Sequence, residues 1–359
     1  MAHSVCKILA LLGLLAATLP QRSAAAQEPS LPGPWPQQRA HSAAASNQQC
    51  EACHVAIARE WRGSYHRRAN SDPAFRLAVQ REPMPFCRRC HAPEADPRRV
   101  ATGWAAQNGV ACVTCHELDG RITSGAGNNS PSHGRPHPLK RDARLSGDAA
   151  CIRCHEFAFP DGKWRREPDY MQLTISEHRA SPYADISCTD CHMPRVLGAS
   201  GRPHRSHAFL AGHDQQTVRA ALQVEAARSG DAVVLRLTPQ RVGHALPTGD
   251  LFRRIVLTLT TEGEPHRRLE QRDLMRQLGN EQPFPGHPVR VVQGDDRLTG
   301  QTEHRFALPP RAAQLPVRWR VTYQRVVVPG SLHGGGGILD GEVLLASGVL
   351  LPDWGRATQ

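Results

Sequence analysis

Five copies of the pattern Cys-x-x-Cys-His carry the clearest chemistry in this sequence. A cysteine pair with this spacing can add both thiols to the vinyl groups of a haem, and the histidine that follows is then held where it can ligate the iron. The sequence therefore predicts five covalently attached haem c groups, each with a motif histidine on its iron. The predicted haem-binding residues are Cys50, Cys53, His54, Cys87, Cys90, His91, Cys112, Cys115, His116, Cys151, Cys154, His155, Cys188, Cys191 and His192.

Two other uses of paired cysteines fit the sequence less well. The chain has 11 cysteines, and all except Cys6 lie in the five motifs. A tetrahedral zinc site takes ligands from two cysteine pairs, so five pairs cannot be shared evenly among such sites, and zinc needs no histidine after each pair. Redox-active dithiols usually occur singly in a thioredoxin-like βαβ context, which is absent here. Haem attachment accounts for every motif cysteine.

The first 26 residues have the features of a secretory signal peptide. Lys7 supplies a positive start, residues 8–17 form an apolar run, and residues 24–26 are small alanines. The apolar run is too short to span a bilayer, and no later segment reaches the length of a membrane helix. We expect a periplasmic or secreted protein, exported through a cleaved signal peptide and not membrane-spanning.

The positions of the motifs predict how the mature chain is divided. Residues 27–45 are rich in proline and read as a linker, and residues 46–214 hold all five motifs. Five haems in this segment leave about 34 residues per haem, too few for a conventional side-chain core, so the porphyrins must form the core. We therefore expect short helices and loops around stacked haems, with residues 55–68 as the clearest helix. The haem-free polypeptide should not fold.

The composition and residue pattern of the sequence change near residue 215. No cysteine follows, and alternation of apolar and polar residues with turn signals between the runs predicts short strands. These strands favour an all-β antiparallel sandwich over residues 215–359. The first could also be a helix, because it is rich in Ala and Leu. The expected strands cover residues 218–226, 232–238, 254–261, 289–293, 304–308, 317–328 and 342–350.

The charge of the chain gives weak information about partners. The formal net charge is +11, but ferric haem with its two propionates is a net anion, and loss of the signal peptide removes Lys7 and Arg22. Many arginines are therefore expected to pair with propionates. No nucleic-acid recognition motif accompanies the basic residues, so we expect no nucleic-acid partner.

The second axial ligand of each iron decides between an electron carrier and a catalyst. The chain has 19 histidines, and the many that lie outside the motifs make bis-histidine ligation the simplest expectation. If His54 and His66 lay on one helix they would be roughly 18 Å apart, so His66 would serve a neighbouring haem. Met84 and Met171 are rival ligands, whereas Met193 adjoins a motif histidine and is excluded.

Three further segments carry a resemblance to a known family. They are Trp61-x-x-Ser64-x-His66, Glu177-His178-x-x-Ser181 and the run from Ile186 to Pro194 around the last motif. They resemble multihaem cytochromes c related to the tetrahaem electron acceptor of hydroxylamine oxidoreductase, over residues 46–214. The fifth motif and the strand-forming segment depart from that family. C-type cytochromes receive their haem outside the cytoplasm, so the resemblance implies a haem maturation machinery as a partner.

The resemblance also implies which histidines are second ligands. It points to His66 and His178, and to His207 in Ser206-His207-Ala208-Phe209. His133 and His137 compete for one role, and we favour His137. His244, in the run Gly243 to Asp250, resembles a segment of multihaem cytochromes with a C-terminal sandwich and could reach back to a haem. His204 and His213 are reserves, and ordinary surface positions are expected for His266, His287, His304 and His333.

Two functions from different classes follow. The first is a periplasmic pentahaem cytochrome that carries electrons along mostly bis-histidine haems between a redox protein donor and an acceptor. The alternative is a multihaem oxidoreductase that acts on a small nitrogen or sulfur compound at one open-faced haem. No motif has lysine in place of its histidine, so the sequence favours the electron carrier over the oxidoreductase. The sandwich as a docking module is a third reading that the sequence neither supports nor excludes.

Overall fold

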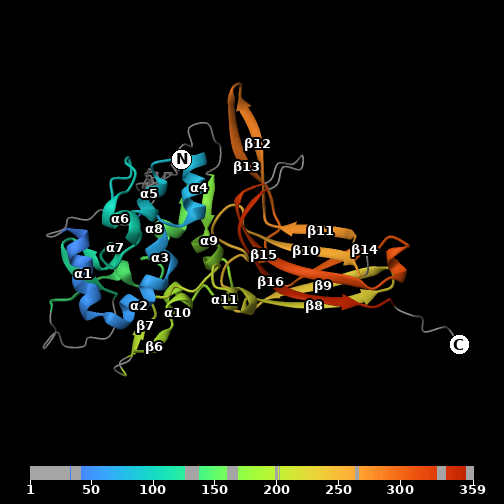
Figure 1. Cartoon of the computed structure of the whole chain (residues 1–359), viewed down its shortest axis with the longest axis horizontal. Helices are drawn as coiled ribbons and strands as arrows, with labels where there is room; N and C mark the ends of the chain where they lie inside the picture. Colours follow the sequence, from blue (N-terminus) through green and yellow to red (C-terminus); the bar gives the residue numbers. More distant parts are fainter. Residues whose placement is uncertain are drawn as a thin grey trace, which may run out of the picture. The chain divides into compact units, whose positions relative to one another are not determined.

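The computed structural model describes Gly33 and residues 42–125, 137–159, 169–198, 201, 203–262, 267–329 and 337–352, all within one compact unit, Leu31–Gln359. We call residues 46–214 the motif segment and residues 215–359 the strand segment. Helices gather in the motif segment and long strands in the strand segment (Figure 1). The predicted signal peptide lies outside the described residues. No described helix is long and apolar enough to cross a membrane.

Short helices carry the five motifs, as predicted. The first motif ends α1 (Ala43–Cys53), and the others lie in α5 (Cys87–His91), α7 (Cys112–His116), α8 (Ile152–His155) and α10 (Cys188–His192). The remaining helices of this segment are α2 (Val55–Gly63), α3 (Tyr65–Arg68), α4 (Pro73–Arg81), α6 (Gly103–Asn108) and α9 (Thr174–Arg179), with a 3₁₀ turn at Ala143–Leu145. Its small strands are β1 (Glu117–Leu118), β2 (Arg121–Ser124), β3 (Lys140–Arg141), β4 (Glu156–Ala158), β5 (Tyr170–Leu173), β6 (Arg195–Leu197) and β7 (Pro203–Arg205).

The helix expected over residues 55–68 is broken at Ser64. The Ser64 hydroxyl donates to the Trp61 carbonyl at 2.7 Å and accepts from the Arg67 amide at 3.3 Å. Serine side chains compete in this way with the helical backbone pattern and favour N-cap positions. Ser64 therefore ends α2 and caps α3, and the chain turns just before His66.

Two antiparallel sheets make up most of the strand segment, which begins with α11 (Gln215–Ala220). One sheet has the order β14-β9-β8, from β8 (Leu222–Ser229), β9 (Ala232–Pro239) and β14 (Thr302–Ala307). The other has the order β11-β10-β15-β16, from β10 (Arg254–Thr261), β11 (Arg268–Leu274), β15 (Val317–Val328) and β16 (Ile338–Leu350). A separate hairpin pairs β12 (Arg276–Phe284) with β13 (His287–Asp295), and a 3₁₀ turn covers Ala312–Gln314.

The prediction of many antiparallel strands is confirmed, with two local differences. The run expected as a first strand over residues 218–226 begins as α11, because the Asp214 carboxylate caps that helix by accepting from the Thr217 amide at 2.7 Å. β11 and β12 were not expected. Their sequences, Arg268–Leu274 and Arg276–Phe284, are polar on most positions, so they lack the alternation that marks a half-buried strand.

The apolar cores of the two segments differ sharply. One cluster of buried residues joins both sheets, with Leu235, Leu257 and Val321 each 0% exposed. The motif segment has a much smaller described cluster of Trp61, Ala111 and Val113. Side chains alone therefore give the strand segment a conventional core, whereas the described part of the motif segment contains little apolar packing of its own.

Truncation of Leu257 should destabilise the strand segment strongly. We expect Leu257→Ala to lower the free energy of unfolding of this segment by about 2–5 kcal/mol, because a buried leucine leaves a cavity. Denaturant unfolding followed by far-ultraviolet circular dichroism measures this. Leu351→Ala, at a leucine 66% exposed, is the control and should change stability by less than about 0.5 kcal/mol. Equal losses in both variants would contradict the assigned core.

Two arginines of the strand segment, Arg276 and Arg290, bind groups of the motif segment. Arg276, 2% exposed, donates to the carbonyls of Tyr170 at 2.9 Å and Met171 at 2.6 Å. Arg290 pairs with the buried Asp169 carboxylate at 3.0 Å. The guanidinium groups satisfy otherwise buried carbonyl and carboxylate oxygens, so separating the two segments would leave these groups unpaired.

Candidate functional site

Among the described residues, four of the five motif histidines lie opposite a second histidine. The ring centroids are 6.3 Å apart for His54 and His137, 6.3 Å for His66 and His155, 6.1 Å for His116 and His207, and 6.3 Å for His192 and His244. The partner never comes from the motif's own helix. Segments distant in sequence therefore bring these imidazoles together in pairs of nearly equal separation.

This separation matches the requirements of an iron held between two imidazoles. Metal–nitrogen bonds of about 2 Å on each side would place the ligating nitrogens about 4 Å apart and the ring centres about 6 Å apart. The cysteines also fit, because none of the ten forms a disulfide and every motif thiol is free to form a thioether. The residues present at these four sites thus fit covalently attached haem with two histidine ligands.

Hydrogen bonds leave Nε2 available at several of these rings. Nδ1 lies 2.9 Å from the Thr123 carbonyl in His116 and 2.8 Å from the Arg205 carbonyl in His207. In the fourth pair, Nδ1 of His192 lies 3.1 Å from the Leu210 carbonyl. An Nδ1–H bond to a carbonyl selects the tautomer whose Nε2 carries a lone pair, and this is the usual arrangement of metal-bound histidine.

Burial keeps the imidazoles of His66 and His155 neutral. It lowers the pKa of His66 to about 3 and the pKa of His155 to about 4. Neighbouring histidines lower the pKa of His66 further, beginning with His155. Only a neutral imidazole offers a lone pair to a metal, so both rings are in the ligating form across the physiological pH range.

The Trp61-x-x-Ser64-x-His66 motif has a visible positioning role. Trp61 is 3% exposed, and its indole N–H donates to the Val110 carbonyl at 2.9 Å. The Val110 amide in turn donates to the His66 carbonyl at 2.9 Å. Gly109 has φ +42°, and a Cβ there would lie 2.5 Å from the His66 carbonyl oxygen. Glycine permits this close approach, so the segment before the third motif fixes the backbone of His66.

His207 is placed by a carboxylate on α2. One Glu60 oxygen accepts from the His207 amide at 2.8 Å, and the other lies 2.9 Å from Nε2 of His204. His204 uses Nε2 in this contact, so Glu60 connects His204 to the loop that carries His207. The reserve role of His204 stays a prediction.

The remaining predicted histidines lie in different surroundings. His137 faces His54, whereas His133 lies outside the described residues. His213 stacks on Tyr65 with ring centroids 3.5 Å apart. Burial first, and then the charges of Arg253 and Arg325, lower the pKa of His213 to about 3. No described motif histidine lies opposite this ring.

His178 was expected as a second ligand, but no described motif histidine lies opposite it. The residue is 8% exposed, and its Nδ1 lies 3.8 Å from Asp148, whose carboxylate accepts from the Cys188 amide at 3.2 Å. Its ring also packs against Gly243, where a Cβ would lie 3.1 Å from it. His178 therefore packs between the last motif and the loop that carries His244, whose own ring lies opposite His192.

His91 differs from the other four motif histidines. Its Nδ1 lies 2.8 Å from the Ala69 carbonyl, and the Phe75 ring stacks on it with centroids 3.8 Å apart and planes within 4°. In the described part of the chain, no second imidazole lies opposite this ring. The second motif therefore has a proximal histidine that faces no second histidine among the described residues.

Interactions among the motif cysteines show which of the five motifs are neighbours. Cys154 interacts electrostatically with Cys90, and Cys151 with Cys188. The fourth motif therefore touches both the second and the fifth. Electrostatic interactions join Cys112 to Cys50, and Cys115 to the cysteines of the fourth motif. The motifs thus run from the first to the third to the fourth, which neighbours the second and the fifth.

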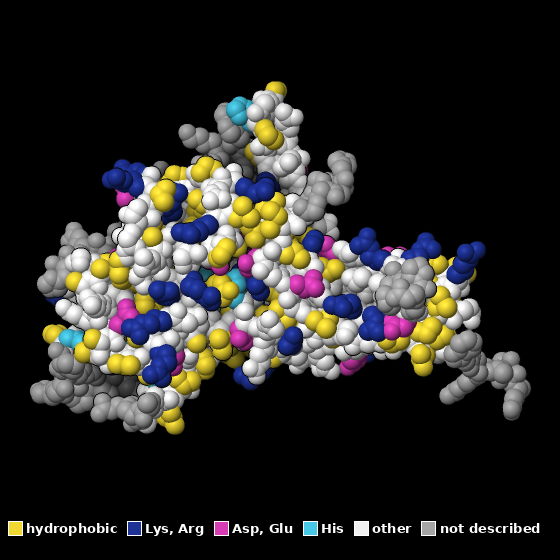
Figure 2. Space-filling model, in the orientation of Figure 1, with side chains coloured by type: hydrophobic (Ala, Val, Ile, Leu, Met, Phe, Trp, Pro, Cys, Tyr) yellow, Lys and Arg dark blue, Asp and Glu magenta, His cyan; other side chains and the backbone are white. Residues whose placement is uncertain are grey.

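Sequence reasoning missed two residues that position these rings. Glu60 and Gly109 were not singled out, although Glu60 directly precedes the recognised Trp61. On the face shown in Figure 2, Lys and Arg side chains are spread over the surface with Asp and Glu between them. That face presents mixed charge.

The motifs and the fold define the chain as a multihaem c-type cytochrome with covalently bound haem c. Residues 49–117, which hold the first three motifs, match the family described as cytochrome c554 and c-prime. The fold is similar to the crystal structure of a penta-haem cytochrome c552 from Thermochromatium tepidum. That match has a TM-score of 0.62 and 21% identity, and covers 85% of this chain and 98% of that chain. No curated protein sequence matches the chain.

Proposed function

We propose that this protein is a periplasmic pentahaem cytochrome that carries electrons between a redox protein donor and an acceptor. The observation that carries the proposal is the set of four histidine pairs with ring centroids 6.1–6.3 Å apart. The proposed second ligands are His137, His66, His207 and His244, for the motif histidines His54, His155, His116 and His192 respectively. His178 is left out of the proposed set.

Haem iron with two histidine ligands changes its coordination little between the ferric and ferrous states, which suits one-electron transfer. The chain's own residues hold this arrangement in place. Backbone carbonyls orient the imidazoles through Nδ1, and buried side chains such as Trp61 fix the backbone that carries them. Rigid ligand positions reduce the reorganisation that would accompany a change of charge.

The order of the motifs suggests a branched path for electrons. The fourth motif neighbours the second, third and fifth, and the first neighbours the third. Cys53 and Cys191, in the first and fifth motifs, are the two exposed cysteines of the ten. We propose that redox partners exchange electrons near these two surface positions, with the fourth site as the junction.

The strand segment is proposed to be a β-sandwich, because its two antiparallel sheets contribute side chains to one buried cluster. It would supply His244 to the fifth site. The proposed periplasmic location rests on the signal-peptide features and on covalent haem attachment outside the cytoplasm, which also implies a maturation machinery as a partner. Nucleic acid is not a proposed partner, and the mixed charges on the face in Figure 2 agree with this.

A second candidate function is favoured by the surroundings of His91. Because no second imidazole lies opposite it among the described residues, the second site could keep one axial position open. An open position is what an oxidoreductase acting on a small nitrogen or sulfur compound requires. This site would lie at one end of the proposed path, next to the fourth motif.

Carbon monoxide titration of the reduced protein tests both candidates. We expect four of the five haems to be low-spin and inert to carbon monoxide, because two histidines fill their axial positions. Binding at one haem would favour an open second site, and variant His91→Lys should then change that binding alone. Binding at three or more haems would contradict the proposed histidine pairs. Complete inertness would support the carrier and remove the second candidate.

A further inference from the structure

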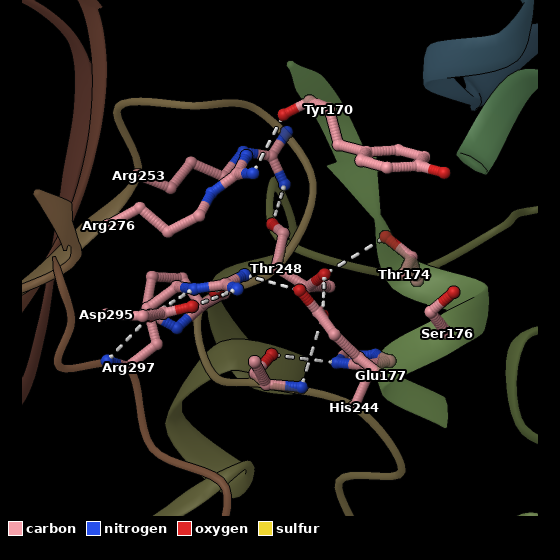
Figure 3. Close-up of polar contacts among 12 residues, drawn as sticks. Tyr170, Thr174, Ser176, Glu177, His244, Thr248, Arg253, Arg276, Asp295 and Arg297 are labelled. Atoms are coloured by element: carbon pink, nitrogen blue, oxygen red, sulfur yellow. Dashed lines mark hydrogen bonds and ion pairs between the residues drawn. The ribbon is translucent and has the colours of Figure 1, made fainter. Parts of the chain in front are cut away.

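Glu177 is a buried carboxylate at the junction between the two segments. It lies on α9 of the motif segment, and its side chain is 11% exposed. Its partners all come from the strand segment, as Figure 3 shows around the labelled Thr248 and Arg297. The residue belongs to a sequence motif whose histidine, His178, faces no motif histidine among the described residues, so the motif needs another explanation.

The Glu177 carboxylate binds the loop that carries His244. Oε2 accepts from the Thr248 hydroxyl at 2.5 Å and from the Ala245 amide at 3.3 Å. The Ala245 carbonyl lies 3.0 Å from Nδ1 of His244. Glu177 therefore holds the N–H of Ala245, and the carbonyl of the same residue contacts the imidazole.

A second set of contacts holds the loop from the strand side. Oε1 of Glu177 pairs with Arg297 at 2.7 Å, and the Arg297 side chain is 6% exposed. Arg297 also donates to the Pro247 carbonyl at 3.3 Å. Next to it, Leu246 and Leu298 exchange backbone hydrogen bonds of 2.8 and 3.0 Å. The loop is thus fixed between a carboxylate of one segment and an arginine of the other.

We propose that Glu177 is the positioning residue for His244, and through it sets the sixth ligand of the haem on the fifth motif. The proposal rests on the ligand pair of His192 and His244 given above. It makes ligation of this one haem depend on the contact between the two segments. The Glu177 carboxylate is a charged acceptor, and its removal leaves the Ala245 amide and the Thr248 hydroxyl without this acceptor.

The test compares variants of the full-length holoprotein. We expect Glu177→Ala to lose the low-spin signal of one haem of five in electron paramagnetic resonance and to gain carbon monoxide binding at one haem. Glu177→Gln should keep that low-spin signal, because an amide oxygen still accepts both hydrogen bonds. It should move the reduction potential of the same haem to more positive values, because a negative charge near it is lost.

Two controls separate positioning from general damage. Glu225→Ala removes a carboxylate from the strand segment that is 57% exposed, and it should leave all five haems unchanged. Thr248→Val removes the hydroxyl contacts with Glu177 and Thr174 and keeps the ion pair, so it should cause a smaller loss of the same signal. This variant keeps the test decisive if Glu177→Ala does not fold.

Variant His244→Ala separates the test of the ligand pair from the test of the positioning role of Glu177. If it leaves every low-spin signal intact, His244 is not a ligand, and both the ligand pair and the role of Glu177 are overturned. If it removes one low-spin signal while Glu177→Ala and Thr248→Val change none, the ligand pair stands and the positioning role alone is overturned. Loss of the same signal in the Glu177→Ala and His244→Ala variants supports the inference.

Discussion

Without attached haem, the motif segment is expected to lose its folded structure while the strand segment keeps its own. The change is replacement of all ten motif cysteines by serine in the mature chain. The described motif segment buries a small apolar cluster around Trp61, Ala111 and Val113, whereas both sheets of the strand segment share a large one. Burial of apolar surface drives folding, and in the motif segment the porphyrins must supply most of that surface.

Limited proteolysis with mass spectrometry, and far-ultraviolet circular dichroism, measure this outcome. We expect rapid cleavage within residues 46–214, loss of the helical signal, and a resistant fragment that begins near residue 215. The holoprotein treated under identical conditions is the control and should resist cleavage in both segments. A haem-free chain whose motif segment remains helical and resistant would show that side chains alone build its core.

Replacement of His66 by alanine should alter the haem at the junction of the path. His66 lies 6.3 Å from His155 between ring centroids, and burial lowers its pKa to about 3, so a neutral ligand would be lost. We expect one haem of five to become high-spin and to bind carbon monoxide. Electron transfer from the first to the fifth site should slow, because the fourth site connects them. Magnetic resonance and stopped-flow reduction measure the two effects.

His213→Ala is the matched control for this variant. His213 is a partly buried histidine whose pKa is also lowered to about 3, but it stacks on Tyr65 and faces no described motif histidine. It should leave the number of low-spin haems unchanged. Equal spectral changes in the two variants would mean that a cavity near the haems, rather than a lost ligand, causes the effect.

The surroundings of His91 and Glu177 suggest different roles for two of the sites. Four motif histidines have a facing imidazole, which favours simple electron transfer, whereas the second motif lacks one among the described residues. The fifth motif receives its facing histidine from the strand segment. One end of the proposed path could thus meet a small molecule, and the other depends on the contact between segments.

Local chemistry determined what the sequence alone could predict. Covalent haem attachment needs only two cysteines and a histidine at fixed spacing, so motifs such as Cys50 to His54 are readable without a structure. The strands β10 and β15 have the predicted bounds, because alternation of apolar and polar residues is also local. β11 and β12 carry no such alternation and were missed.

Only the tertiary structure decided which imidazoles face one another. His66 lies closer in sequence to His54 and His91, yet it faces His155, because Ser64 breaks the helix and Gly109 allows a close backbone approach. His178 and His244 were both expected as ligands. In the structure His178 lies near Asp148, whereas His244 lies on a loop bound by Glu177 and faces His192. Pairs of this kind are long-range contacts, fixed by how distant segments pack and not by the spacing of residues along the chain.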